Sequence, residues 1–245
     1  MKIRVINPNT TAAITAKIGA AAKDVAAAGT VIDAVQPSFG APSIEGHHDD
    51  VWAAAGVAEQ VRLGELQGAD AYVIACFGDP GLHSARELAR GPVIGIAEAA
   101  FHAASLLATG FSVVTTLSRT CVIAEHLVLQ YGFERRCRGI HGTDIAVLEL
   151  EDPAGDAYRR ILVCAQQALL RDRSSAIVLG CAGMADLCRR LQDELGVPVV
   201  DGVAAAVKMA EALVSLGLGT SKLGDYAFPL TKPYVGLAAP YSPAR

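Results

Sequence analysis

The chain reads AYVIACFGD at residues 71–79 and AIVLGCAGM at residues 176–184. Each stretch is a short apolar run that ends at a cysteine and has a glycine two positions later, which predicts a buried strand followed by a tight turn. The two cysteines, Cys76 and Cys181, are 105 positions apart. We therefore interpret the two stretches as equivalent strands of a duplicated unit.

Two more pairs of segments support the duplication. VIGIAEAA at residues 93–100 resembles VVDGVAAA, which begins 106 positions later, and VINPNT at residues 5–10 resembles VVTTLS, which begins 108 positions later. Because the three offsets are nearly equal and the order is the same, we expect two lobes of common plan, residues 1–108 and 109–215. A C-terminal segment, residues 216–245, is expected to pack back on the first lobe.

Short apolar runs alternate along the chain with Ala-rich segments of helical period. This alternation is typical of the α/β class, here as two pseudo-symmetric lobes, each a mostly parallel sheet flanked by helices. Ligands of such sheets bind at the carboxyl ends of the strands, so we expect the active site in the cleft between the lobes. The expected strands are residues 2–7, 31–35, 71–76, 93–96, 111–116, 176–180 and 197–201, and the expected helices are residues 11–28, 51–67, 82–89, 97–108, 120–131, 154–171, 185–195 and 204–216.

Composition narrows the classes of partner. The net charge is −4 and no block of Lys and Arg occurs, which disfavours a nucleic-acid partner. Residues 91–117 are mostly apolar, but Glu98 and His102 interrupt them and turn residues divide them, so we expect soluble core and no membrane partner.

Six cysteines without an evident secretory signal indicate a reducing cytoplasm. No zinc-ligand spacing occurs, and we expect residues 47–50 (HHDD) to form a solvated loop rather than a metal site.

Two opposed thiols suit a proton transfer. Inverting a stereocentre requires a base on one face of a carbon and an acid on the other, and running the reaction backwards exchanges their roles. Two identical groups meet this need, and a helix N-terminus can lower the pKa of a cysteine so that one thiolate faces one thiol at neutral pH. A single cysteine at the end of an apolar strand is more often a packed small hydrophobe. The matched pair favours Cys76 and Cys181 as catalytic acid and base.

The surrounding residues predict a neutral substrate. Backbone N–H groups after each cysteine can form donor nests for the oxygen that gains charge as the proton leaves. Uncharged side chains at the ends of the first strand of each lobe offer donors and acceptors, although the Asn7–Thr10 turn also suits a helix N-cap. The candidate substrate contacts are Asn7, Asn9, Phe77, Gly78, Thr115, Thr116, Ala182 and Gly183.

The sequence resembles the hydantoin racemase branch of the aspartate/glutamate racemase superfamily. The resemblance lies in seven motifs in order, namely VINPNT (5–10), SIEG (43–46), ACFGDPG (75–81), GPVIGIAE (91–98), VVTT (113–116), LGCAGM (179–184) and VDGV (200–203). It implies a two-lobe α/β homo-oligomer without cofactor or metal. It also implies that Cys76 and Cys181 racemise 5-monosubstituted hydantoins, each cysteine abstracting the proton of one enantiomer.

Departures from relatives narrow the substrate and leave alternatives open. Members that act on glutamate or aspartate typically read Cys-Asn-Thr and Cys-Thr-His, whereas this chain reads CFG at 76–78 and CAG at 181–183. A neutral cyclic diamide therefore fits better than an amino acid. Phe39, Ile44 and Phe77 line an apolar pocket for the 5-substituent or belong to the core. Allantoin racemisation stays open, because allantoin is a 5-ureidohydantoin, and so does a non-catalytic protein that binds a small molecule.

Overall fold

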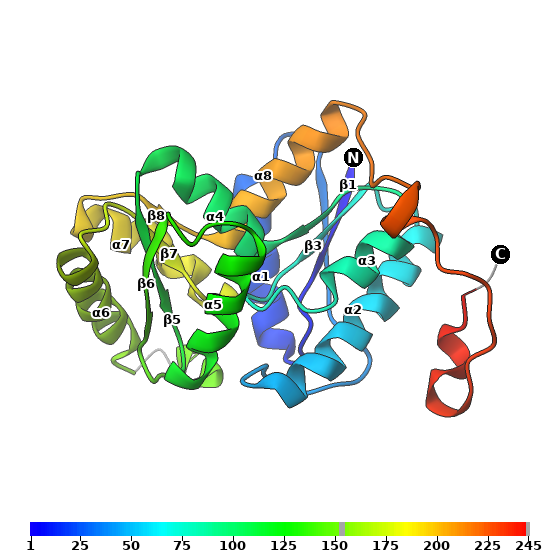
Figure 1. The fold of residues 1–245 in the computed structure, drawn as a ribbon, viewed down its shortest axis with the longest axis horizontal. Helices are drawn as coiled ribbons and strands as arrows, with labels where there is room; N and C mark the ends of the chain where they lie inside the picture. The colour runs from blue at the N-terminus through cyan, green and yellow to red at the C-terminus, as the bar shows by residue number, and fades with distance from the viewer. Residues whose placement is uncertain (152–154, 244–245) are drawn as a thin grey trace.

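The computed structural model describes residues 1–151 and 155–243. It contains two parallel four-stranded sheets that lie side by side, each flanked by helices (Figure 1). The predicted α/β class with two lobes is confirmed. In the first sheet the strand order is β2-β1-β3-β4, made of β1 (Lys2–Ile6), β2 (Val31–Val35), β3 (Ala71–Ile74) and β4 (Val93–Gly95). In the second the order is β6-β5-β7-β8, made of β5 (Phe111–Thr115), β6 (Cys137–Gly142), β7 (Ile177–Leu179) and β8 (Val199–Val200).

The two sheets follow one plan, in which the first and third strands of each half form the centre. β1 pairs with β3 in the first half, and β5 pairs with β7 in the second. The carboxyl ends of these central strands are where the order of a doubly wound sheet reverses and where ligands bind. Every residue of β3, β5 and β7 is buried, which explains why AYVI in β3 and IVL in β7 are continuous apolar runs, while β5 buries Ser112 and Thr115 among apolar neighbours.

Helices cover both sheets and are bounded close to the predicted ranges. One large core cluster includes residues of both halves, with Phe101 packed against Phe77, Phe111 and Phe133 at ring-centroid distances of 5.5–5.7 Å. The halves therefore share a core. The helices are α1 (Ala12–Val25), α2 (His47–Leu66), α3 (Leu82–Leu88), α4 (Ile96–Leu107), α5 (Cys121–Gln130), α6 (Ala157–Asp172), α7 (Cys188–Leu195) and α8 (Gly202–Ser215).

Two helices cross between the halves. α8, the last helix of the chain, packs against α1, α4, β3 and β4, so it covers the first sheet. α4 in turn contacts α5, β7 and β8 of the second half. The division of the chain at residues 108 and 215 stays a prediction, because these two helices link the halves beyond any single boundary.

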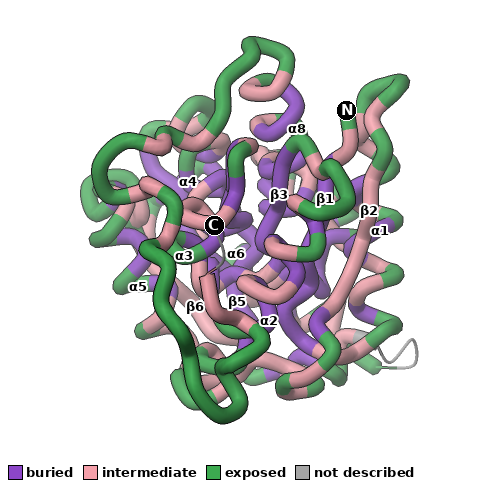
Figure 2. The backbone as a smooth tube through the Cα atoms, turned by 90° about the vertical axis from the view of Figure 1, so that its right-hand side faces the viewer, coloured by how far each residue is buried: buried purple, intermediate pink, exposed green. Residues whose placement is uncertain are grey.

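The C-terminal segment runs over the outside of the first half. Thr220 N donates to the Arg90 carbonyl at 3.0 Å, and Lys222 Nζ donates to the carbonyls of Arg86 and Glu87. Farther along, Tyr241 packs edge-on against Phe39. Much of this segment is exposed (Figure 2).

The structure corrects two expectations about elements. β6 was not predicted, because CRGIHG contains two glycines and no apolar alternation, and it forms an edge strand paired only with β5. The HHDD stretch is not a loop, because α2 begins at His47 and carries Asp49 and Asp50 in its first turn, where the helix dipole favours carboxylates. Within the described residues, no helix combines the length and the apolar character needed to cross a membrane.

Candidate active site

A cavity of about 70 Å³ lies between the two halves, at the carboxyl ends of the central strands. All ten residues that the sequence marked as candidates line it: Asn7, Asn9, Cys76, Phe77, Gly78, Thr115, Thr116, Cys181, Ala182 and Gly183. They come from the carboxyl ends of β1, β3, β5 and β7 and the segments that follow them, two strands from each half. The internal repeat therefore brings equivalent segments of the two halves to one place.

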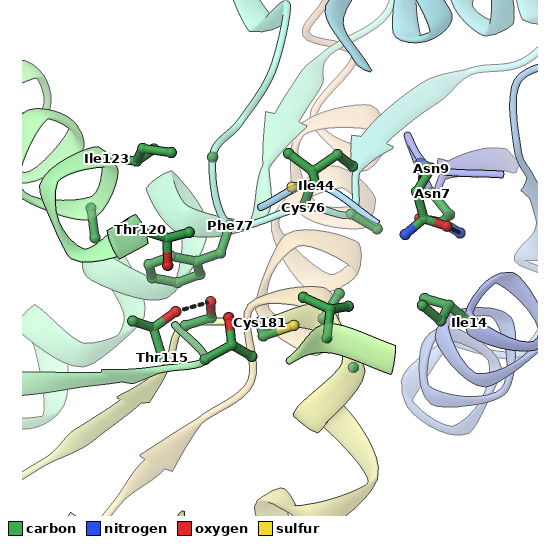
Figure 3. A pocket seen from close by; sticks show the side chains of 18 of the residues that line it. Asn7, Asn9, Ile14, Ile44, Cys76, Phe77, Thr115, Thr120, Ile123 and Cys181 are labelled. Atoms are coloured by element: carbon green, nitrogen blue, oxygen red, sulfur yellow. Dashed lines mark hydrogen bonds between the residues drawn. The ribbon is translucent and has the colours of Figure 1, made fainter. Parts of the chain in front are cut away.

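Cys76 and Cys181 occupy opposite walls of this cavity. Each follows a central strand, β3 or β7, and Figure 3 shows the two sulfurs pointing into the same space from above and below. They are close enough for a charge on Cys181 to raise the pKa of Cys76. A small ligand in this cavity would therefore have one of the two thiols on each side.

The surroundings of Cys76 disfavour its thiolate. Burial, more than any other cause, raises its pKa to about 12, and charge on Cys181, Asp50 and Asp79 adds to the rise, while a hydrogen bond from the Gly78 backbone opposes it. The expected lowering by a helix N-terminus is wrong for Cys76. The physical reason is that a loop, residues 77–81, separates Cys76 from the start of α3 at Leu82.

The asparagines form a rigid polar end of the cavity. Asn7 Nδ2 donates to Asn9 Oδ1 and to Thr15 Oγ1, both at 2.9 Å, and Asn9 Oδ1 also accepts from Thr11 N at 2.9 Å. These bonds leave the Asn9 amide N–H₂ without an acceptor among the described residues. The motif thus both organises the turn into α1, as the alternative interpretation proposed, and presents a donor to the cavity.

The threonines belong to a close contact between two central strands. Thr115 Oγ1 donates to the Gly180 carbonyl at 2.8 Å. A Cβ at position 180 would lie 2.6 Å from Thr115 Cβ, so only glycine permits this approach directly before Cys181. Thr116 is buried beside it. The contact fixes the wall that carries Cys181.

A buried carboxylate braces the loop that carries Cys76. Asp79 Oδ1 accepts from Ala97 N and Oδ2 from Glu98 N, both at 3.0 Å, so Asp79 caps the N-terminus of α4. Oδ2 also accepts from Tyr131 Oη of the second half at 2.9 Å. Burial raises the pKa of Asp79 to about 7. The Cys76 loop is therefore attached to both halves.

Sequence reasoning missed part of the lining. Ile44 and Phe77 line the cavity, whereas Phe39 packs against Tyr241 instead. The loop around Ile44 is held over the site by Glu45, whose Oε1 accepts from Val147 N at 3.0 Å. Ala75 and Gly180 also line the cavity and lie in the quoted motifs directly before the two cysteines. No sequence signal marked the other lining residues, because helices and loops far apart in the chain contribute them: Ile14, Asp50, Thr120, Ile123, Ala124 and Val147.

The chemistry available at this site is that of two thiols, several neutral hydrogen-bonding groups and the carboxyl group of Asp50. Across the described parts of the chain, no three His, Cys, Asp or Glu side chains gather closely enough to hold a metal ion. Asn9 and the backbone after each cysteine offer donors, and Thr115 and Thr116 offer hydroxyl groups. The arrangement can hold a small ring with carbonyl and N–H groups between two proton carriers.

Comparison with known proteins shows which family the chain resembles over most of its length. A family model described as Asp/Glu/Hydantoin racemase matches residues 3–210. The hydantoin racemase of Rhizobium meliloti is 50% identical over 236 residues, 96% of this chain and 98% of that protein. Among solved structures, an allantoin racemase from Klebsiella pneumoniae has a TM-score of 0.98 at 58% identity, with all of both chains covered. The allantoin racemase of Pseudomonas fluorescens has a TM-score of 0.93 at 43% identity and covers 96% of this chain and 100% of that one.

Proposed function

The chain belongs to the Asp/Glu/hydantoin racemase family, and from that premise we propose that it racemises 5-monosubstituted hydantoins without a cofactor, with Cys76 and Cys181 as a two-base pair. Membership of this family makes the protein an isomerase of the racemase type. The observation that carries the finer proposal is that the two cysteines line one cavity from opposite walls. The duplicated strands that carry them explain why the two walls are alike.

The reaction moves one proton in and one proton out. The thiolate of one cysteine removes the proton from C5, and the electron pair is delocalised onto the neighbouring C4 carbonyl oxygen as an enolate. The thiol of the other cysteine then delivers its proton to the opposite face of C5, which restores the carbonyl and leaves the thiolate on the second sulfur. The backbone N–H groups of Ala182 and Gly183 and the Asn9 amide are the donors proposed to stabilise the enolate oxygen, and Phe77 and Gly78 are proposed as further substrate contacts.

The lining supports a neutral substrate. Of the described residues around the cavity, none is Lys or Arg, so a substrate carboxylate would enter without a cationic partner. Thr115, Thr116 and the asparagines instead offer uncharged partners. A hydantoin has two carbonyl and two ring N–H groups, and its C5 proton is activated by the adjacent carbonyl.

Allantoin is the second candidate substrate. The two solved allantoin racemases match nearly the whole chain, at 58% and 43% identity, which favours it. Because allantoin is a hydantoin with a ureido group at C5, the same cysteines would act on the same carbon.

We also propose that the enzyme works in the cytoplasm as a homo-oligomer. Six free thiols support a reducing compartment. Exposed apolar side chains on the C-terminal segment, such as Leu230, Val235 and Leu237, support a surface that another copy covers.

A deuterium-exchange experiment tests the function. One enantiomer of 5-isobutylhydantoin, or of allantoin, is incubated with the enzyme in deuterated water while optical rotation and the C5 proton signal are followed. We expect loss of rotation together with deuterium at C5. The double variant Cys76→Ala/Cys181→Ala gives the spontaneous rate. Rotation that declines no faster with the natural enzyme than with that variant would leave a binding protein as the better description.

A further inference from the structure

Asp50 is the one acidic side chain among the described residues that line the cavity. It lies in the first turn of α2 and faces the loop after Cys76: its Oδ1 is 3.6 Å from the position of a Cβ built on Gly78, and Ile123 Cγ2 is 3.7 Å from the same point. Asp50 and Ile123 therefore share one end of the cavity. Figure 3 shows Ile123 and Thr120 on one side of the cysteine pair and the asparagines on the other.

The Asp50 carboxylate has no hydrogen-bond donor within the part of the chain that the structure describes. Burial raises its pKa, and the charge of His47 only partly opposes this rise. A half-buried carboxylate without donors carries a free-energy cost that a ligand with N–H groups would relieve. The free lone pairs thus point to a substrate group that donates hydrogen bonds.

The position of Asp50 also restricts which part of the substrate it can face. A negative charge there opposes further negative charge nearby, and the same repulsion raises the pKa of the Cys76 thiol. The enolate oxygen must therefore lie away from Asp50, toward the Asn9 amide and the backbone N–H groups of Ala182 and Gly183. With C5 held between the two sulfurs, the 5-substituent then occupies the end that Asp50 and Ile123 form.

We propose that the Asp50 carboxylate accepts N–H hydrogen bonds from the 5-substituent and so selects a ureido group over an alkyl group of the same shape. The inference rests on the proposed hydantoin racemisation and deepens it, because it makes allantoin the preferred substrate. A ureido group carries three N–H donors, whereas an isobutyl group has nearly the same branched shape and none.

A purely structural role for Asp50 is the competing explanation. Carboxylates in the first turn of a helix are stabilised by the helix dipole. However, Asp49 already serves this turn, since its Oδ2 accepts from Glu45 N at 3.0 Å. The dipole gives no reason for Asp50 to face the cavity without a donor.

The test compares kcat/KM for allantoin and for 5-isobutylhydantoin in the natural enzyme, Asp50→Asn and Asp50→Leu. We expect the natural enzyme to prefer allantoin. Losing hydrogen bonds to a charged acceptor should lower the allantoin-to-isobutyl ratio about 10- to 100-fold in Asp50→Leu, and less in Asp50→Asn, whose amide keeps one acceptor oxygen. Asp193→Asn, a change at an exposed site on α7, is the matched control and should leave the ratio as it is.

Each outcome has one meaning. A ratio that stays the same in folded variants, or an equal loss for both substrates, overturns the role of Asp50 while the proposed function stands. A natural enzyme that racemises the isobutyl compound but not allantoin also overturns it. Racemisation of neither compound by the natural enzyme instead defeats the proposed function itself. Far-UV circular dichroism checks that each variant is folded, and the near-isosteric Asn variant keeps the test decisive if the Leu variant does not fold.

Discussion

Groups around Cys76 shift the pKa of its thiol in opposite directions, and the resulting pKa determines at which pH Cys76 is a thiolate. The Gly78 backbone hydrogen bond favours the thiolate, whereas burial and the charges on Cys181, Asp50 and Asp79 favour the thiol, and the net effect is a pKa near 12. Because the pKa is raised, Cys76 holds its proton at neutral pH, and the thiolate fraction increases as the pH rises toward that value. The cavity therefore suits Cys76 first as a proton donor.

This raised pKa predicts the pH dependence of activity. In the direction in which Cys76 removes the C5 proton, its thiol must first ionise, so kcat/KM should rise from about pH 7 to about pH 10 as the ionised fraction grows. Because the equilibrium constant of a racemisation is 1, kcat/KM for the other enantiomer must rise in the same way. Initial rates with one enantiomer, corrected by the Cys76→Ala/Cys181→Ala rate at each pH, measure this. A corrected kcat/KM that is flat or falls over that range would contradict the assignment of Cys76 as one of the two bases.

The sequence predicted some residues of the site and not others. The ten candidates converge because each lies at or just after the end of a central strand of one repeat, and apolar runs and glycines in the sequence indicate where those strands end. Asp50 was assigned to a solvated loop, because its place in the cavity depends on how α2 packs across the sheet. The raised pKa of Cys76 likewise depends on burial, which no local pattern encodes.

At the scale of elements, the two halves cap equivalent helices by different means. In the second half Asp201 caps α8 itself, accepting from Val203 N and Ala204 N. In the first half the equivalent N-cap is Gly95, whose missing side chain leaves room for the carboxylate of Asp79 to reach Ala97 N and Glu98 N. In both helices a carboxylate accepts from the second and third backbone N–H groups. In α8 the carboxylate belongs to the N-cap residue Asp201, and in α4 it belongs to Asp79 of the Cys76 loop.

This difference predicts how stability changes when the residues at positions 79 and 95 are exchanged, so that glycine stands at 79 and aspartate at 95. Asp79→Gly should lower the free energy of unfolding by about 1–3 kcal/mol, because buried donors lose their acceptor. Gly95→Asp alone should also lower the free energy of unfolding, because its Cβ would lie 2.3 Å from Asp79 Cγ. The double variant should recover about 1 kcal/mol relative to Asp79→Gly, since Gly95 and Asp201 have nearly the same φ and ψ.

Urea unfolding of the four proteins measures the exchange, with Asp201→Ala as the control for losing a cap in the second half. A double variant no more stable than Asp79→Gly would mean that Asp79 acts mainly through Tyr131 rather than through α4. The pairing of Asp79 with Gly95 was not visible in the sequence, because the two residues meet only in the folded chain.

Sequence patterns predicted most elements and failed where the pattern was weak. The central strands and α1, α3, α4 and α5 lie within a few residues of their expected bounds, because each has a clear apolar run or helical period. β6 has neither, and its strand conformation comes from pairing with β5. Residues 185–187 were expected to begin the helix 185–195, but they end a 3₁₀ turn at Ala182–Leu187, and α7 begins at Cys188.

At the scale of the whole molecule, the crossed helices tie the two halves into one packing unit. α8 buries Val203, Ala206, Val207 and Ala210 in a core cluster that contains strand residues of both sheets. The duplication in the sequence predicted two lobes, but it carried no sign that the last helix of the second repeat covers the first sheet. Which sheet α8 covers depends on the apolar face that each sheet leaves without a helix, and the sequence repeat does not reveal that face.

A shared core predicts that the halves unfold together. Trp52, the only tryptophan of the chain, lies on α2 in the first half and reports that half by fluorescence, whereas far-UV circular dichroism reports the helices of both. Because unfolding one half would expose the apolar faces of α4 and α8, the two probes should give the same urea midpoint in a single transition. Repeating the measurement at several protein concentrations separates any effect of oligomer dissociation. A fluorescence midpoint distinct from that of circular dichroism at every concentration would mean that each half is stable without the helix that the other half contributes. In that case the crossing of α4 and α8 would position the walls of the active site but would not hold the fold together.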